Sequence, residues 1–145
     1  MQRVKQAGVS IDGQEIASIG NGLLVLLGVH RDDQRQDVRW LADKIVNLRI
    51  FADEQGRMNR SLLDVGGAML VVSQFTLYGD CRRGRRPSWG EAAGPAEAES
   101  LYDLFVRQVS DSGIPTRQGV FQAMMEVSLI NSGPVTLLLD SHKNF

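Results

Sequence analysis

Period-two alternation in the first part of the chain predicts a β-hairpin. Residues 3–19 show this pattern, and Asp12-Gly13 stands between the two halves. Alternation is typical of strands, and Asp-Gly is a strong signal for a two-residue turn. A second turn at Asn21-Gly22 precedes residues 23–29, LLVLLGV, which are apolar at nearly every position. Such a run predicts a central strand that is buried on both faces.

Two segments have the longer period of an amphipathic helix. Within residues 32–48, apolar side chains recur three or four positions apart, and Asp32 or Asp33 is suited to cap the first turn. A second helix is predicted to begin at Pro95, which fits a first helical turn, and to end at Gly113.

The remaining segments predict four further strands and one long loop. We expect a short strand at 49–51, a long buried strand at 69–77, and closing strands at 127–130 and 135–139. Residues 80–94 are rich in Arg, Gly and Pro and are interpreted as a loop. Strands outnumber helices, so we expect one domain of the α/β or α+β class, with helices on one side of a curled, largely antiparallel sheet.

The amino-acid composition excludes several kinds of function. In 145 residues, 16 Lys and Arg balance 17 Asp and Glu to a net charge of -1, which excludes a general basic coat for nucleic acid but allows a local basic patch. One cysteine and two histidines exclude an intrachain disulfide and a Cys/His zinc site. No apolar run approaches the roughly 20 residues that cross a bilayer, so we expect a cytoplasmic protein without a membrane partner.

Several common catalytic motifs are missing from the sequence. No glycine-rich phosphate loop and no G-x-S-x-G nucleophile elbow occurs. His30 and His142 are interpreted as edge or surface histidines, and Cys81 as an incidental thiol, because the sequence identifies no catalytic partner for them.

Three other segments are candidates for chemistry. Residues 73–77, SQFTL, place two hydroxyls and an amide in a strand predicted to be buried, where an unpaired polar group costs about 1–3 kcal/mol. These groups either pair with a neighbouring segment or serve a site. Residues 131–136, NSGPVT, form either an ordinary hairpin turn or a loop that exploits the backbone freedom of Gly and Pro. The third segment carries Arg82, Arg83, Arg85 and Arg86, and is either a solvated basic loop or a phosphate contact.

The first two segments resemble the signature motifs S-Q-x-T and N-x-G-P-[VF]-T of the D-aminoacyl-tRNA deacylase (D-tyrosyl-tRNA deacylase) family. The similarity covers nearly the whole chain and includes residues 22–28 (GLLVLLG), 48–51 (LRIF) and 84–88 (GRRPS). This resemblance implies that residues 1–145 form a single deacylase-like domain.

The resemblance also implies the fold and the shape of the site. The domain is expected to have three layers, α/β/β, with a barrel-like sheet and two main helices, and to form a homodimer. Each active site is expected at the dimer interface, where one subunit supplies the catalytic residues Ser73, Gln74, Phe75 and Thr76. The other subunit is expected to supply a chiral-selectivity loop with a cis Gly-Pro bond, which Arg3 helps to fix. The residues of this loop are Asn131, Gly133, Pro134, Val135 and Thr136.

The activity implied by the resemblance is hydrolysis of the ester of D-aminoacyl-tRNA and of glycyl-tRNA, with rejection of L-aminoacyl esters. Neither motif contains a general base, so the ribose 2′-hydroxyl of the tRNA is expected to assist while backbone N–H groups stabilise the oxyanion. Phe121 and Met125 are expected to bind the terminal adenosine, and the four arginines to contact tRNA phosphates. No metal, cofactor or DNA partner is expected. The alternative is a non-catalytic, dimeric RNA-binding module, which would bind tRNA without turnover.

Overall fold

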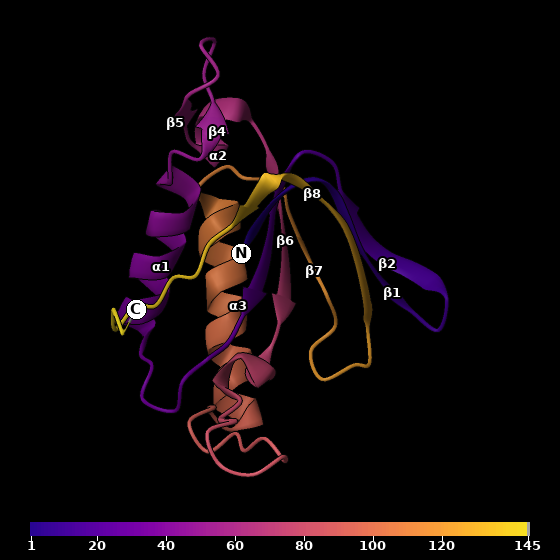
Figure 1. Ribbon diagram of the computed structural model, residues 1–145, viewed down its shortest axis with the longest axis vertical. Helices are drawn as coiled ribbons and strands as arrows, with labels where there is room; N and C mark the ends of the chain where they lie inside the picture. Colours follow the sequence, from indigo (N-terminus) through magenta and orange to yellow (C-terminus); the bar gives the residue numbers. More distant parts are fainter. Residues whose placement is uncertain (145) are drawn as a thin grey trace.

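The computed structural model describes residues 1–144, in which a six-stranded sheet curls over itself beside two long helices (Figure 1). Strand β1 (Gln2–Ile11) is central because it pairs antiparallel with three other strands. Along one edge, its first residues pair with β3 (Gly22–Leu27) and its last residues with β2 (Gln14–Ile19). Its other edge pairs with β8 (Glu126–Thr136).

Two parallel strands extend the sheet on the far side of β3. Strand β6 (Ala68–Ser73) pairs parallel with β3, and β7 (Thr116–Gln118) pairs parallel with β6. The register places Leu27 opposite Ser73. Strands β3 and β6 therefore end at the same edge of the sheet.

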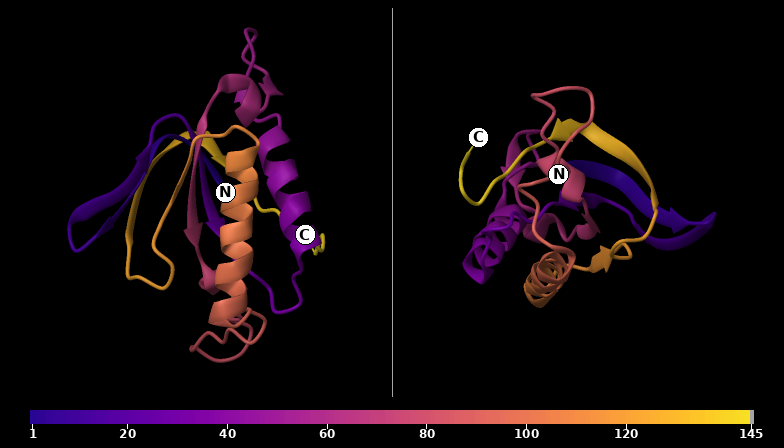
Figure 2. Two further views of the ribbon diagram at one scale, coloured as in Figure 1. Left: turned by 180° about the vertical axis from the view of Figure 1, so that it is seen from behind. Right: turned by 90° about the horizontal axis from the view of Figure 1, so that it is seen from below.

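Helices α1 (Arg35–Asn47) and α3 (Pro95–Asp111) lie side by side and cover one face of β3 and β6 (Figure 2). Tyr102 and Phe105 of α3 are almost fully buried in this first core. The opposite face of β3 and β6 packs against β1 and β2, which curl over it and enclose a second core. Helices, central strands and curled strands form the three expected layers, α/β/β.

The smaller elements lie at the two ends of the sheet. A projecting hairpin, β4 (Phe51–Ala52) and β5 (Met58–Arg60), and the one-turn helix α2 (Leu62–Val65) lie at the end where β6 begins (Figure 1). The 3₁₀ turn η1 (Phe75–Tyr78) lies at the end where β6 finishes.

Most of the predicted elements are confirmed. The first hairpin turns at Asp12-Gly13, and both long helices occur close to their predicted bounds. The short strand expected at 49–51 is β4, which begins only at Phe51. Among residues 1–144, no helix is both long enough and apolar enough to cross a membrane.

Two strand predictions are wrong. The strand predicted at 69–77 ends at Ser73, because the chain turns at Gln74 and continues as η1. The apolar residues that suggested a longer strand, Phe75 and Leu77, are instead exposed on this turn. The strand predicted at 135–139 is also wrong, because only Val135 and Thr136 belong to a strand: β8 continues to Thr136, and the chain then leaves the sheet.

The segment 131–136 is not a hairpin turn between two strands. Val4 of β1 pairs with Asn131, and Gln2, only two positions away, pairs with Thr136. Five steps along β8 thus oppose two steps along β1, so the residues between Asn131 and Thr136 bulge out of a strand that stays paired on both sides.

Candidate functional site

The S-Q-x-T segment forms a sharp turn at the end of β6. The N–H of Gln74 donates to the carbonyl oxygen of Leu27 at 2.8 Å, beyond the last paired position of the sheet. The side-chain amide of Gln74 donates to the hydroxyl of Thr76, which ties the turn to itself. Of the polar groups that were expected to be buried, Thr76 is exposed, Ser73 and Gln74 are half-buried, and the side chains of Gln74 and Thr76 pair with each other.

Among the described residues, two backbone N–H groups of this turn have no acceptor. Leu77 donates to the carbonyl of Gln74, but the N–H groups of Phe75 and Thr76 come too early in η1 for such a bond. Within the described part of the chain, neither of them has a side-chain acceptor either. The turn thus presents two adjacent donors at an exposed position, beside the Phe75 ring, which meets Trp89 edge-on with 5.7 Å between ring centroids.

Phe121 and Met125 lie in the loop that follows β7, at the same edge of the sheet. The N–H of Gly119 donates to the carbonyl of Val71 at 3.0 Å, which holds the start of this loop against the last residues of β6. Phe121 is partly buried and tilts against Tyr102, with 6.1 Å between ring centroids. Met125 packs on the second core, and its sulfur accepts the N–H of Val120. Both side chains are therefore partly core residues, near the S-Q-x-T turn.

The bulge of β8 is held by side chains on both sides. The Gly133-Pro134 peptide bond is cis, as the resemblance implied. The Asn131 carboxamide accepts the N–H of Val135 at 2.9 Å and donates to the side chain of Gln2 at 2.8 Å. The guanidinium of Arg3 donates to the carbonyl oxygen of Ser132 at 3.0 Å. A fixed backbone projects from the strand as a result, with Gly133 and Pro134 exposed at its tip.

Within one subunit, the bulge and the S-Q-x-T turn do not meet. The bulge of β8 lies opposite residues 2–4 of β1. These pair with residues 22–24 of β3, and residues 22–24 pair with residues 68–70 of β6. Ser73 is three residues farther along β6, so the two motifs lie about 10 Å apart along the strands and three strands, or about 14 Å, apart across the sheet. The two motifs therefore lie in separate places within a single chain.

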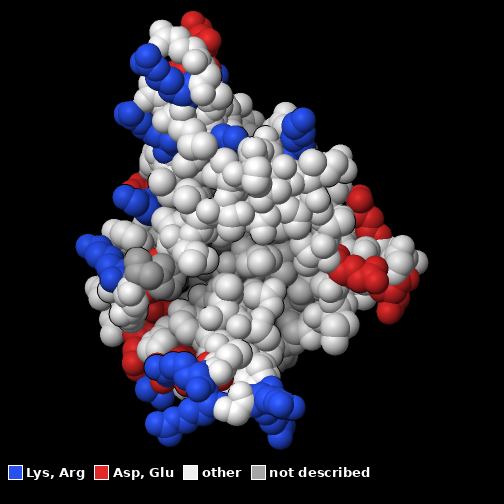
Figure 3. Space-filling view, in the orientation of Figure 1, with Lys and Arg blue, Asp and Glu red and all other residues white. Residues whose placement is uncertain are grey.

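The arginine loop is exposed, and its four charges are not equivalent. Asp80 accepts two side-chain bonds from Arg82, each 2.8 Å long, and the Arg82 N–H at 2.9 Å. These bonds lower the pKa of Asp80 to about 2. In the described structure, Arg83, Arg85 and Arg86 have no carboxylate within 4.0 Å. Figure 3 shows Lys and Arg side chains at the lower end of the molecule, where this loop lies, below a mostly uncharged middle.

A groove with a volume of about 560 Å³ runs between η1 and the C-terminal segment. Its lining includes Leu77 and Tyr78 of η1, Leu26 of β3 and residues 136–140. Burial, and to a smaller extent the nearby Asp33 carboxylate, raises the pKa of Tyr78 to about 12. This phenol therefore stays protonated near neutral pH and does not serve as a base.

One cluster of polar side chains was not predicted from the sequence. His30 and His142, interpreted separately as edge histidines, lie with their ring centroids 5.9 Å apart, and Asp33 lies beside both. No spacing rule signals this contact, because the two histidines come from opposite ends of the chain.

Comparison with known proteins identifies the family. Residues 1–140 match the family described as D-Tyr-tRNA(Tyr) deacylase. This chain is 57% identical to D-aminoacyl-tRNA deacylase of Thermosipho africanus over 145 residues, which cover all of this chain and 97% of that relative. The chain belongs to the D-Tyr-tRNA(Tyr) deacylase family.

Two solved structures share the fold of this chain. The chain superimposes on a structure described as c-Myc DNA Unwinding Element Binding Protein with a TM-score of 0.89 and 37% identity, covering 94% of this chain and 93% of that one. A probable eukaryotic D-amino acid tRNA deacylase has the same fold, with a TM-score of 0.74, 18% identity and 92% of each chain covered. The family and the fold class predicted from the sequence are therefore confirmed.

Proposed function

We propose that this protein hydrolyses D-aminoacyl-tRNA, with residues 1–145 acting as a single deacylase domain in the cytoplasm. The activity is supported by family membership and by the names of relatives that match the full length of the chain. In the reaction, water attacks the ester carbonyl carbon, the bond to the ribose oxygen breaks, and a proton passes to that oxygen. The products are a free D-amino acid and tRNA.

The observation that carries the mechanism is the pair of free N–H groups at Phe75 and Thr76. Donors aimed at the ester oxygen stabilise the negative charge that develops there in the transition state. The S-Q-x-T turn itself holds no carboxylate or imidazole, and the neighbouring Tyr78 is protonated. We therefore assign the assisting role to the 2′-hydroxyl of the terminal ribose, with Ser73, Gln74 and Thr76 shaping the turn.

A single proline substitution tests directly whether these N–H groups stabilise the oxyanion. Phe75→Pro removes one donor at the first position of η1, where proline is tolerated, and Gln74 before it already lies outside the helical region. Phe75→Ala, the matched control, loses the ring but keeps the N–H. We expect the proline variant to lose about 10²–10³-fold in kcat relative to the alanine variant. Equal kcat values for both variants would remove the oxyanion role.

The second half of the site is proposed to come from a partner subunit. Support comes from the separation of the two motifs in one chain and from the bulge tip, which is exposed and projects outward. Apolar side chains are also exposed near both half-sites, including Phe75 at 57% and Leu138 at 72%. A symmetric dimer would bring the bulge of each subunit to the S-Q-x-T turn of the other and cover such side chains.

Subunit mixing tests this arrangement. A Phe75→Pro subunit and a Gly133→Ala subunit each carry one defective half-site. Random mixing gives half heterodimers with one intact site each, so activity is expected to return to about a quarter of the wild-type value. If both halves came from one chain, mixing would restore nothing.

Chirality is proposed to be read by the bulge backbone. The L and D esters differ only in the direction of the side chain, and a fixed wall rejects one direction more strongly than added contacts favour the other. Glycyl esters have no side chain and should be hydrolysed as well. The test is a deacylation assay on D-, L- and glycyl-esters of one tRNA, with turnover expected for the first and third. Tight tRNA binding without turnover of any ester would favour the RNA-binding module instead.

Substrate binding is proposed to use the same edge of the sheet. Phe121 and Met125 provide an aromatic face and a polarisable sulfur for the terminal adenine, and base stacking contributes about 1–3 kcal/mol. The arginine loop is proposed to contact phosphates of the tRNA, with Arg83, Arg85 and Arg86 supplying the unpaired charges and Arg82 ordering the loop.

A further inference from the structure

The two histidines and Asp33 form a compact cluster beside the groove. One nitrogen from each imidazole and one oxygen of Asp33 all lie within 4.8 Å of one another. His142 Nε2 is 3.4 Å from Asp33 Oδ1. Two atoms bound to the same tetrahedral zinc, with bonds of about 2.0 Å, are separated by roughly 3.3 Å. The His142–Asp33 pair already has that separation.

Local backbone structure brings these side chains together. His30 follows β3, and its N–H donates to the Asp33 carboxylate at 2.8 Å, which fixes Asp33 before α1 begins. On the C-terminal segment, Asp140 accepts the N–H groups of His142 and Asn144 and so closes a turn. This turn directs His142 back toward the loop that precedes α1.

The surroundings carry more negative than positive charge. Asp37 Oδ1 is 3.6 Å from His142 Nε2. The carboxylates of Asp32 and Glu91 lie beside His30. Arg31 pairs with these same two carboxylates. Asp33 and Asp37 are only 14% and 17% exposed.

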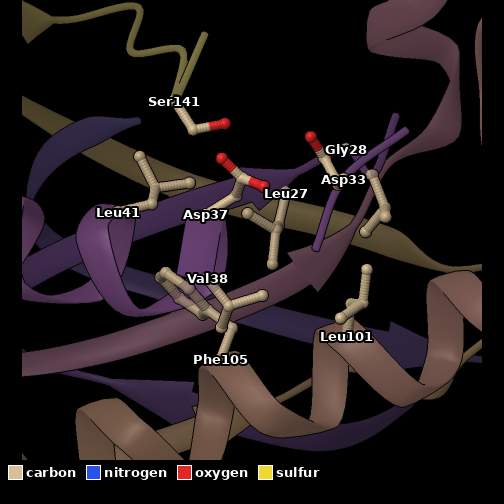
Figure 4. A pocket seen from close by; sticks show the side chains of 10 residues that line it. Leu27, Gly28, Asp33, Asp37, Val38, Leu41, Leu101, Phe105 and Ser141 are labelled. Carbon is tan, nitrogen blue, oxygen red and sulfur yellow. The ribbon is translucent and has the colours of Figure 1, made fainter. Parts of the chain in front are cut away.

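A small cavity of about 30 Å³ adjoins these carboxylates. Figure 4 shows Asp33, Asp37 and the hydroxyl of Ser141 gathered at its polar end, above a floor that includes Val38 and Phe105. The space is large enough for a water molecule, and of the three residues in the cluster only Asp33 lines it.

We propose that His30, Asp33 and His142 form a binding site for a divalent transition-metal ion, with zinc as the best fit. Two imidazoles and one carboxylate, with an open fourth position, are a common donor set for zinc in proteins.

Both ring nitrogens of His30 have partners. Nε2 is 3.0 Å from Glu91 Oε2, and Nδ1 accepts the N–H of Asp32 at 3.2 Å. An ion bound at Nδ1 would replace the Asp32 N–H and leave the Glu91 carboxylate on Nε2, and such partners orient metal-bound histidines. Zinc here fastens the C-terminal segment to the loop before α1, and therefore fixes the side of the groove that this segment forms.

The test is titration of the EDTA-treated full chain with Zn²⁺ alone, by calorimetry. We expect one ion per chain, and at least tenfold weaker binding in His142→Ala and in Asp33→Asn. Asparagine still accepts the N–H of His30, so the second variant keeps the loop. Asn144→Ala, which removes a tail hydrogen bond but no ligand, is the matched control and should bind as the wild type does.

Two further readouts separate this site from other zinc contacts. Co²⁺ should give the visible bands of tetrahedral coordination in the wild type, and these should be lost in His30→Ala. Zn²⁺ at a hundred times its Kd should shift the unfolding equilibrium of the wild type about 100-fold toward the native state, and that of His142→Ala much less. The proposal is overturned if the chain binds no Zn²⁺, or if the histidine variants, folded in EDTA as the wild type is, bind it equally well.

Discussion

The guanidinium of Arg3 donates from Nε to the carbonyl oxygen of Ser132, 3.0 Å away, so a residue at the start of β1 holds the bulge near the end of β8. The same guanidinium donates from Nη1 to the carbonyl oxygen of Ile50. One side chain thus connects the bulge to the segment after α1. Its fork of donors is the feature that makes this double contact possible.

Arg3→Lys should loosen the bulge, because an ammonium cannot reproduce two donors at fixed angles. We expect the D-to-L ratio of deacylation rates to fall and the free energy of unfolding to drop by about 1–3 kcal/mol. Rates on matched D- and L-esters and urea unfolding measure the two effects. Lys5→Gln, an exposed change on the same strand, is the control and should alter neither. An unchanged ratio in Arg3→Lys would show that the bulge needs no such support.

Gly133→Ala should displace the bulge. A Cβ at this position would lie 2.7 Å from Val135 Cγ2 and 2.9 Å from the Val135 nitrogen, and φ is +133°. Gly84→Ala is the matched control, since Gly84 also has positive φ, +70°, but nothing within 4 Å of the added Cβ. We expect Gly133→Ala to reduce D-ester hydrolysis at least tenfold and Gly84→Ala to leave it nearly unchanged. Similar rates in the two variants would contradict a requirement for this backbone position.

Thr76→Val should retain most of the activity. The Thr76 hydroxyl accepts from the Gln74 amide and lies on a turn without a base that could activate it. Its loss should weaken the turn by about 1 kcal/mol and lower kcat only a few-fold. Single-turnover kinetics and mass spectrometry provide the measurement. Capture of an acyl group on Thr76 would make it the nucleophile and replace the mechanism proposed above.

Replacing Arg83, Arg85 and Arg86 together by Gln should weaken tRNA binding and reduce its salt dependence. Each lost phosphate contact lowers the slope of log K against log salt by about 0.7–0.9. Arg82→Gln is the matched control, because the charge of Arg82 is already paired with Asp80. We expect the triple variant to change the slope more per residue than the single variant does. Equal slopes in wild type and triple variant would return these arginines to a solvated loop.

The Asp80–Arg82 pair should persist to low pH. Its bonds lower the pKa of Asp80 from 3.8 to about 2, so the pair is complete above about pH 4 and is lost as the pH falls toward 2. An NMR titration of the Asp80 carboxyl carbon measures this pKa. In Arg82→Gln it should move back toward the ordinary value, whereas Arg85→Gln should leave it low.

Local patterns predicted much of this molecule. The Asp12-Gly13 turn and both long helices follow from short-range rules of sequence, and the structure agrees with them. The end of β6 could not be predicted in this way. Phe75 and Leu77 continue the apolar run, but whether an apolar side chain is buried depends on what lies beside it, and in the described structure these two stay 57% and 53% exposed.

The same limit applies to the candidate site. Sequence motifs identified residues 73–76 and 131–136, but their separation in one subunit follows from the pairing of four strands and is not visible along the chain. The four arginines of residues 82–86 are equivalent along the chain, and only the fold shows that Arg82 is paired with Asp80. His30 and His142 offered no signal at all, since only the fold of the C-terminal segment brings them together.

The pairing of β1 with β8 has a consequence for synthesis of the protein. The first strand leaves the ribosome early, but its outer edge stays open until the last strand has been made, and Met1 finds its partner Leu137 only then. A nascent or truncated chain therefore exposes the long edge of β1, which is prone to pair with other chains. Synthesis of the last strand forms the bulge of β8 and closes this aggregation-prone edge in the same step.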